Sequence, residues 1–152
     1  MLIMPRPVLD LEHYAPALLT FLANKLTVGA NALYREKFGV GVTEWRIMAL
    51  LAVEAPIPAA RICQVIGLDK APVSRCLAGM QLAGQVRVKP DRRDARLRPV
   101  ALTATGRRLH DRIIKVALER EARLLSCLND RERRTLLALL NRLRTNLDAP
   151  ED

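Results

Sequence analysis

The sequence predicts one mainly α-helical domain that carries a small β-hairpin. The chain has 152 residues and is half apolar but only 3% aromatic, so its core must be aliphatic, which favours packed helices. Apolar residues recur at three- and four-residue steps over most of the chain, whereas residues 85–102 suit two short strands. A short helix, a second helix and then a basic hairpin form the layout of a winged helix-turn-helix.

The first predicted helix begins at Asp10, which can cap it, and runs to about Lys37 with a bend near Pro16. Its apolar stripe consists of Leu11, Tyr14, Leu18, Leu22, Leu26, Ala30 and Leu33. That stripe is too long for a small winged domain to cover, so we expect part of it to face something else. Gly39 and Gly41 then interrupt the chain.

A helix-turn-helix is predicted by the segments that follow. Thr43 is expected to cap a helix that ends near Ala55, and a short helix should span residues 59–66. Gly67 makes a tight corner before Asp69, the expected N-cap of a third helix. This order is the geometry that presents a recognition helix to the major groove of DNA.

The helix after Asp69 is the candidate recognition helix, with Pro72 in its first turn and Gly84 as its stop. Its apolar positions are Val73, Leu77, Met80 and Leu82, of which Val73 and Leu77 are assigned to the core. Its candidate DNA contacts are Lys70, Ala71, Ser74 and Arg75 near the N-terminal end, and Gln81 further along. Arg75 can bond guanine bidentately, and Ser74 and Lys70 can also meet phosphates.

A basic hairpin is predicted next, with strands at residues 85–89 and 97–102 around a charged turn. Residues 84–108 contain eight basic and two acidic residues, so a net charge of +6 out of +9 lies in about one-sixth of the chain. Clustered arginines on a hairpin indicate a surface that meets phosphates. A solvated charged face is the alternative, but the preceding helix and an isoelectric point of about 10.3 favour nucleic acid over a membrane.

Two more helices are predicted after the hairpin. Thr103 should cap a long helix that reaches Leu128, and Asn129 with Glu132 should form the capping box of a last helix that fades after Asp148.

Both ends of the chain therefore carry apolar stripes in excess of what the middle can bury. An intramolecular bundle of three helices would cover them, and so would a dimer. We favour a homodimer joined by residues 10–37 and 104–148. A DNA-binding protein with one helix-turn-helix gains affinity when a dimer presents two copies of it to a two-fold symmetric DNA site.

Several short motifs occur in order between residues 42 and 106. They are Val42-Thr43-Glu44-Trp45-Arg46-Ile47-Met48-Ala49-Leu50-Leu51, Asp69-Lys70, Val73-Ser74-Arg75, Gly84, Asp91-Arg92-Arg93-Asp94-Ala95-Arg96 and Val100-Ala101-Leu102-Thr103-Ala104-Thr105-Gly106. Together they resemble the MarR family of bacterial transcription regulators. The resemblance implies a single domain over residues 1–152, with residues 42–103 as its DNA-binding lobe, and it also implies the dimer.

The resemblance also implies roles for the hairpin turn, or wing. Arg96 matches the arginine that enters the minor groove, and Arg92 and Arg93 should contact phosphates. Asp91 and Asp94 match acids that shape the wing by orienting the neighbouring arginines.

Regulators of this family commonly hold a small, often aromatic acid between the dimer helices and the DNA-binding lobe. Trp45 and Arg46 lie where the second helix should meet the first and fifth, and are the candidate effector-binding residues. A plain core aromatic is the stronger interpretation of Trp45. Arg46 would pair with a ligand carboxylate or with Glu12, Glu36 or Glu44.

Other classes of function are disfavoured. Residues 1–8 contain no secretory signal, and the longest apolar run, residues 47–53, is too short to span a bilayer, which indicates a cytoplasmic protein. His13 and His110 are the only histidines, and no catalytic constellation, metal-ligand spacing or cofactor motif is present, so an enzyme is not expected.

The three cysteines, Cys63, Cys76 and Cys127, lie in apolar helical patterns and are expected to be buried free thiols. Relatives that sense oxidants use a cysteine in the first long helix, which this chain lacks, so redox sensing is disfavoured.

The sequence therefore predicts a dimeric, sequence-specific regulator that acts as a repressor, binds a palindromic operator and is released by a small ligand. One alternative is a non-regulatory architectural or RNA-contacting nucleic-acid binder. Another is a small-molecule carrier or enzyme with an incidental basic face.

Overall fold

A computed structural model describes residues 6–94 and 96–150 of the chain. Residues 1–5, which belong to the segment predicted to lack a secretory signal, lie outside this range, as does Ala95 of the wing. The chain forms two compact units, of which the first ends at Ile113 and the second begins at Ile114. None of the described helices has the length and apolar character that crossing a membrane requires.

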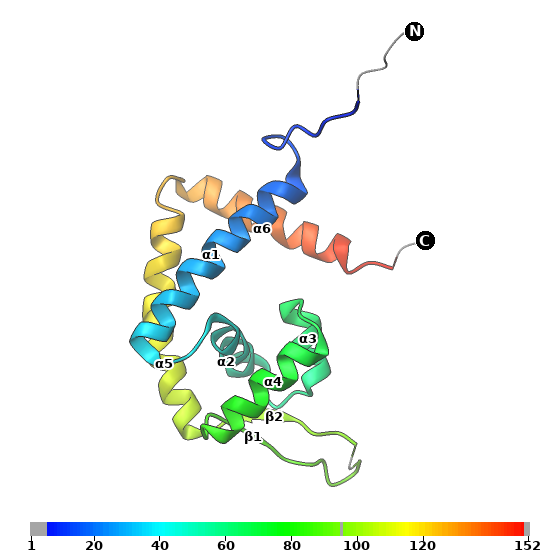
Figure 1. Cartoon of the computed structure of the whole chain (residues 1–152), viewed down its shortest axis with the longest axis vertical. Helices are drawn as coiled ribbons and strands as arrows, with labels where there is room; N and C mark the ends of the chain where they lie inside the picture. Colours follow the sequence, from blue (N-terminus) through cyan, green and yellow to red (C-terminus); the bar gives the residue numbers. More distant parts are fainter. Residues whose placement is uncertain (1–5, 95, 151–152) are drawn as a thin grey trace. The chain divides into compact units, whose positions relative to one another are not determined.

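The architecture is mainly helical with one hairpin, as predicted (Figure 1). The elements are α1 (Ala15–Phe38), α2 (Val42–Glu54), α3 (Ala59–Ile66), α4 (Lys70–Leu82), β1 (Val86–Val88), β2 (Val100–Leu102), α5 (Ala104–Leu124) and α6 (Asp130–Leu147).

Helix α1 begins later than predicted. Tyr14 is its N-cap residue, with extended backbone, and Pro16 lies in its first turn. Asp10 caps only a short turn, where its Oδ1 accepts a hydrogen bond from the N–H of Glu12 at 3.1 Å. The prediction of a helix from Asp10 with a bend at Pro16 is therefore wrong. A proline in the first turn sacrifices no helical hydrogen bond, so it can start the helix without breaking it.

Helices α2 and α5 also differ from the prediction at one end. Gly41, and not Thr43, is the N-cap of α2. Helix α5 ends at Leu124 instead of reaching Leu128, because residues 125–128 form a turn.

Two other helix starts are confirmed. Asn129 and Glu132 form the expected capping box of α6, with the N–H of Glu132 donating to Asn129 Oδ1 at 3.0 Å and the N–H of Asn129 donating to Glu132 Oε2 at 2.8 Å. Asp69 is the N-cap of α4, although its side chain makes no capping hydrogen bond.

The hairpin strands are shorter than predicted and pair antiparallel, with Val86 opposite Leu102 and Val88 opposite Val100. Val86, Val100 and Leu102 are buried, whereas Arg87 is exposed, as the alternation predicts. The N–H of Val100 also donates to the carbonyl oxygen of Ile57 at 2.7 Å. This bridge fixes the hairpin to the turn that precedes α3.

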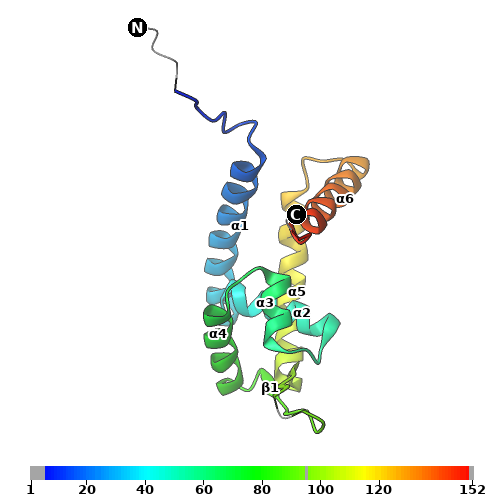
Figure 2. The same cartoon turned by 90° about the vertical axis from the view of Figure 1, so that its right-hand side faces the viewer.

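The core of the first unit is aliphatic. Its most deeply buried side chains are Ile47, Met48, Leu51, Ile62, Met80, Ile113, Val73 and Val100. Helix α4 packs against α2, α3 and β1, and Figures 1 and 2 show these elements side by side. Val73 and Leu77 belong to the core, as predicted. Leu82 does not: it is 93% exposed, because two residues after Met80 the helix has turned by about 200°.

Gly106 allows a close approach of α5 to the hairpin. A Cβ at this buried position would overlap the carbonyl oxygen of Gln85, which also accepts the N–H of Thr103 at 3.0 Å. We expect Gly106→Ala to lower the free energy of unfolding by about 2 kcal/mol, because a backbone atom must move. Urea denaturation measures the effect, with Gly79→Ala as the control. A Cβ there meets nothing within 4 Å, so that variant should gain up to about 1 kcal/mol.

The prediction of three buried thiols is wrong. Cys63 and Cys76 are only partly buried, and Cys127 is exposed in the turn after α5. Cys76 is nonetheless protected, because burial raises the pKa of its thiol to about 11, with a further contribution from the Glu44 carboxylate.

We therefore expect Cys76 to resist alkylation. The thiolate is the reactive form, and at pH 8 its fraction at Cys76 is about 100-fold lower than for a thiol with the ordinary pKa of 9.0. Iodoacetamide labelling followed by peptide mass spectrometry should show Cys127 modified first and Cys76 last. Raising the pH toward 11 should accelerate labelling of Cys76. Labelling of Cys76 as fast as that of Cys127 at pH 8 would contradict this protection.

Candidate nucleic-acid interface

Helix α4 presents a solvent-facing surface at its N-terminal end. The predicted contact residues Lys70, Ala71, Ser74, Arg75 and Gln81 are all exposed. Their exposure follows from the burial of Val73, Leu77 and Met80, which fix the opposite face of the helix in the core. The sequence prediction thus placed all five residues on the accessible side.

Gly67 forms the corner between α3 and α4, and an ion pair joins α3 to α2. Gly67 is the C-cap of α3 with φ 69°, a left-handed conformation that favours glycine, and its N–H donates to the carbonyl oxygen of Cys63 at 3.0 Å. Arg61 of α3 donates from Nε and Nη2 to the carboxylate of Glu54 at 2.8 and 2.9 Å. That hydrogen bonding holds the pKa of Glu54 below its usual value and ties α3 to the end of α2.

The two wing acids act on the backbone of the wing. Asp91 Oδ1 accepts the N–H of Arg93 at 2.7 Å, and Asp94 Oδ1 accepts the N–H of Arg96 at 2.9 Å. The N–H of Asp91 donates to the carbonyl oxygen of Leu97 at 2.9 Å, which closes the loop. This geometry supports a wing-shaping role for both acids.

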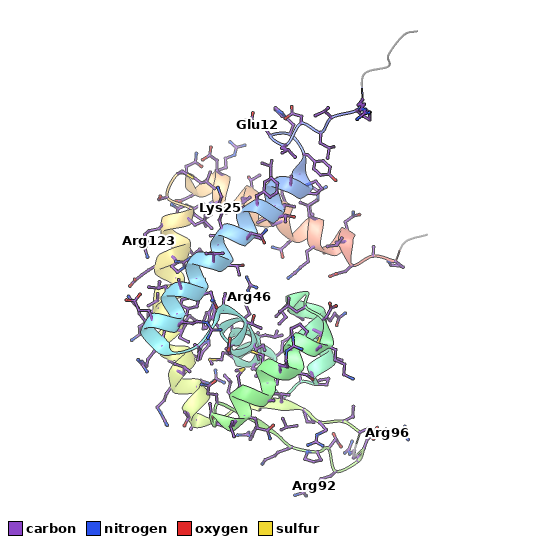
Figure 3. The ribbon with its side chains drawn as sticks, viewed as in Figure 1. Glu12, Lys25, Arg46, Arg92, Arg96 and Arg123 are labelled. Atoms are coloured by element: carbon purple, nitrogen blue, oxygen red, sulfur yellow. The ribbon has the colours of Figure 1, made fainter. Side chains whose placement is uncertain are left out.

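The wing arginines are free to meet a partner. Arg92, Arg93 and Arg96 are exposed. Figure 3 shows Arg92 and Arg96 at the tip of the hairpin, with their side chains pointing away from it.

More basic residues surround the wing than the motifs assigned. The additional exposed residues are Arg87, Lys89, Arg98, Arg107 and Arg108. The charge count at residues 84–108 contained this signal, but the motifs gave these residues no role. A carboxylate-poor, arginine-rich surface of this kind is suited to a polyanion.

Trp45 is packed among other aromatic rings. Its ring stacks on His110 with centroids 5.5 Å apart and meets the edge of Tyr34 at 6.2 Å. Tyr34 also lies 6.4 Å from Phe38, so three of the chain's five aromatic residues meet where α1, α2 and α5 join. These contacts support a packing role for Trp45, although its side chain is only partly buried and keeps some access to solvent.

Arg46 reaches from α2 to α1, as Figure 3 shows. Its Nη2 donates to Thr27 Oγ1 at 2.9 Å. Within the described part of the chain it forms no ion pair with Glu12, Glu36 or Glu44. Among the same residues, no cluster of histidine, cysteine or acidic side chains is arranged to hold a metal ion.

Comparison with known proteins gives matches over both the fold and the sequence. A sequence model described as MarR family matches residues 38–97. A MarR/EmrR family transcriptional regulator from Acinetobacter sp. ADP1 superposes with a TM-score of 0.86 and 34% identity, covering 92% of this chain and 99% of that chain. No curated protein sequence matches the chain.

Two further solved structures are similar in fold. One is the MepR–DNA complex of S. aureus, with a TM-score of 0.76 and 18% identity, covering 90% of this chain and 99% of that chain. The other is the PcaV transcriptional regulator of Streptomyces coelicolor with its natural ligand, with a TM-score of 0.78 and 17% identity, covering 93% of this chain and 99% of that chain.

Proposed function

We propose that this chain, which belongs to the MarR family of transcriptional regulators, is a dimeric repressor. It would bind a palindromic operator and be released from it by a small molecule. Members of this family are DNA-binding regulators and not enzymes. The observation that carries the proposal is the pairing of an exposed α4 face with an arginine-rich wing in one compact unit. A helix for the major groove beside a basic hairpin for the backbone and minor groove suits duplex DNA.

In this proposal residues 42–103 form the DNA-binding lobe. Lys70, Ala71, Ser74, Arg75 and Gln81 face the major groove, Arg92 and Arg93 contact phosphates, and Arg96 enters the minor groove, while Asp91 and Asp94 hold the wing in shape. The MepR–DNA complex supports the use of this fold for binding DNA.

The dimer is proposed to form through α1 and through the last two helices. Exposed apolar side chains on α1 are Leu18, Leu19, Phe21, Leu22 and Leu26, and those on α6 are Leu137, Leu139, Leu140, Leu143 and Leu147. Helix α6 contains no buried residue at all. Apolar surface on this scale is typical of protein–protein interfaces, and a second copy of the chain presents the same surfaces in return.

The effector is proposed to be a small aromatic acid. Arg46 is the candidate partner for its carboxylate, because the guanidinium has only a neutral hydroxyl as hydrogen-bond partner in the described structure. Trp45 is the candidate aromatic wall beside it. The PcaV structure with its natural ligand supports the capacity of this fold to hold a small molecule.

Selection of bound sequences from random duplex DNA, followed by footprinting, tests the function. We expect one enriched palindrome and a protected region symmetric about its centre. Uniform binding to any duplex would favour the architectural alternative, and preference for RNA would favour the RNA-contacting one.

Arg96→Ala should weaken operator binding by about 1–3 kcal/mol while leaving fold and dimer intact, because this exposed side chain contributes nothing to the core. Fluorescence anisotropy with labelled operator measures the loss. Arg123→Ala is the control, since Arg123 is also exposed but belongs to the second compact unit and not to the proposed DNA-binding lobe. Wild-type affinity in Arg96→Ala would rule out the assigned role of the wing.

A further inference from the structure

Leu82 is the most exposed large apolar residue found in the described part of the chain. Its side chain is 93% exposed, on the last turn of α4. Because the core does not use this side chain, it is free to contact a partner, and burial of a leucine against that partner would supply up to ~2 kcal/mol. No neighbouring element of the first unit covers it.

Leu82 continues an apolar line along the exposed face of α4. At 100° per residue, Ala71, Ala78 and Leu82 point within about 40° of one another, and all three are exposed. Arg75 flanks this line on one side and Ser74 on the other. The centre of the proposed DNA-facing surface is therefore apolar, with polar groups at its margins.

In the major groove of DNA, the apolar feature of a base edge is the C5-methyl group of thymine. Alanines at positions 71 and 78 let the helix approach the base edges closely. The longer side chain of Leu82 adds reach at the C-terminal end, where a helix that enters the groove by its N-terminus recedes from the bases. The increase in side-chain size along the line thus matches the expected distance to the groove floor.

We propose that α4 reads thymine C5-methyl groups through this apolar line and that Leu82 is a specificity-determining residue for a thymine in each half-site. The inference rests on the proposed function, because it requires α4 to lie in the major groove. It assigns sequence selectivity to apolar contacts in addition to the hydrogen bonds of Arg75.

A cycle of protein and DNA changes tests the inference. Each thymine of the selected operator is replaced in turn by deoxyuridine, which removes only the methyl group, and affinity is measured for the wild type, Leu82→Ala and Val53→Ala. Val53 is 84% exposed on α2, outside α4, and serves as the matched control. Because Leu82 is exposed, its replacement should not disturb the fold.

For the wild type, deoxyuridine at one symmetric pair of positions should lower affinity about 16-fold, about fourfold per methyl group. Leu82→Ala should lose a similar factor on the thymine operator and nothing more on the deoxyuridine operator, whereas Val53→Ala should behave as the wild type. A wild type that binds the operator specifically but ignores the methyl groups overturns the inference and leaves the proposed function standing. Methyl dependence that persists in Leu82→Ala, or a change of oligomeric state in that variant, also overturns it. Failure to select any operator overturns the proposed function itself.

Discussion

Operator binding is expected to weaken by about 10³–10⁵-fold between roughly 50 and 200 mM salt. A dimer that brings Arg92, Arg93 and the first turn of α4 from each chain would neutralise about six to ten phosphates. Each neutralised phosphate releases a condensed counterion, so the log–log slope of affinity against salt should be roughly −5 to −9. A salt titration by anisotropy measures this slope, and a slope near zero would contradict a phosphate-contacting wing.

Two substitutions separate the contact classes within that titration. Arg92→Ala should flatten the slope by about two per dimer, one per chain, with similar losses on operator and scrambled duplex. Arg75→Ala should instead reduce the difference in affinity between operator and scrambled duplex. A contact to a base edge contributes little to binding where the wrong base is present. Equal losses for Arg75→Ala on both duplexes would place Arg75 among the phosphate contacts.

The elements predicted most closely from sequence have strong local signals at both ends. The bounds of α3 and the start of α4 follow from Pro58, Gly67 and Asp69, and the capping box of α6 needs only Asn129 and Glu132. Such signals act over a few residues, so they can be recognised in the sequence without knowledge of the tertiary fold.

The errors have two sources. Asp10 and Thr43 are residue types that often cap helices, but Tyr14 and Gly41 are the N-caps of α1 and α2. The other errors come from apolar spacing. Leu82 was included in the apolar pattern of its helix, but it follows Met80 by two residues, a step that places it on the opposite face, where it is exposed. Cys127 was placed in a helix because an apolar pattern continues past Leu124, although the chain turns there. An apolar residue is compatible with a turn or an exposed face, and only the packing around it decides which it occupies.

The candidate site was partly predictable. Charge and motif order identified the wing, but the sequence did not show that Asp91 and Asp94 hold backbone N–H groups. The stacking of Trp45 on His110 joins residues far apart in sequence, and no local pattern encodes such a contact.

Leu140→Glu should dissociate the proposed dimer and abolish specific DNA binding. Leu140 is a partly exposed leucine of α6, a helix without any buried residue. In a two-fold interface each substitution occurs twice, so a loss of about 2 kcal/mol per copy becomes about 4 kcal/mol, or roughly 1,000-fold in dimer affinity. Light scattering at micromolar concentration should give about twice the 17.0 kDa chain mass for the wild type and the chain mass itself for the variant.

Leu22→Glu tests the same interface from α1, where Leu22 is 50% exposed. Val53→Glu is the control, because Val53 is an exposed apolar residue outside both dimerisation segments. We expect Leu22→Glu to weaken the dimer and Val53→Glu to leave it intact, with all three variants retaining helical content by circular dichroism. DNA binding should follow the oligomeric state, because a monomer presents one α4 where a two-fold operator requires two. A wild type that is monomeric at micromolar concentration would contradict the architecture. If Leu140→Glu remains a dimer and still binds its operator, α6 is not part of the dimer interface.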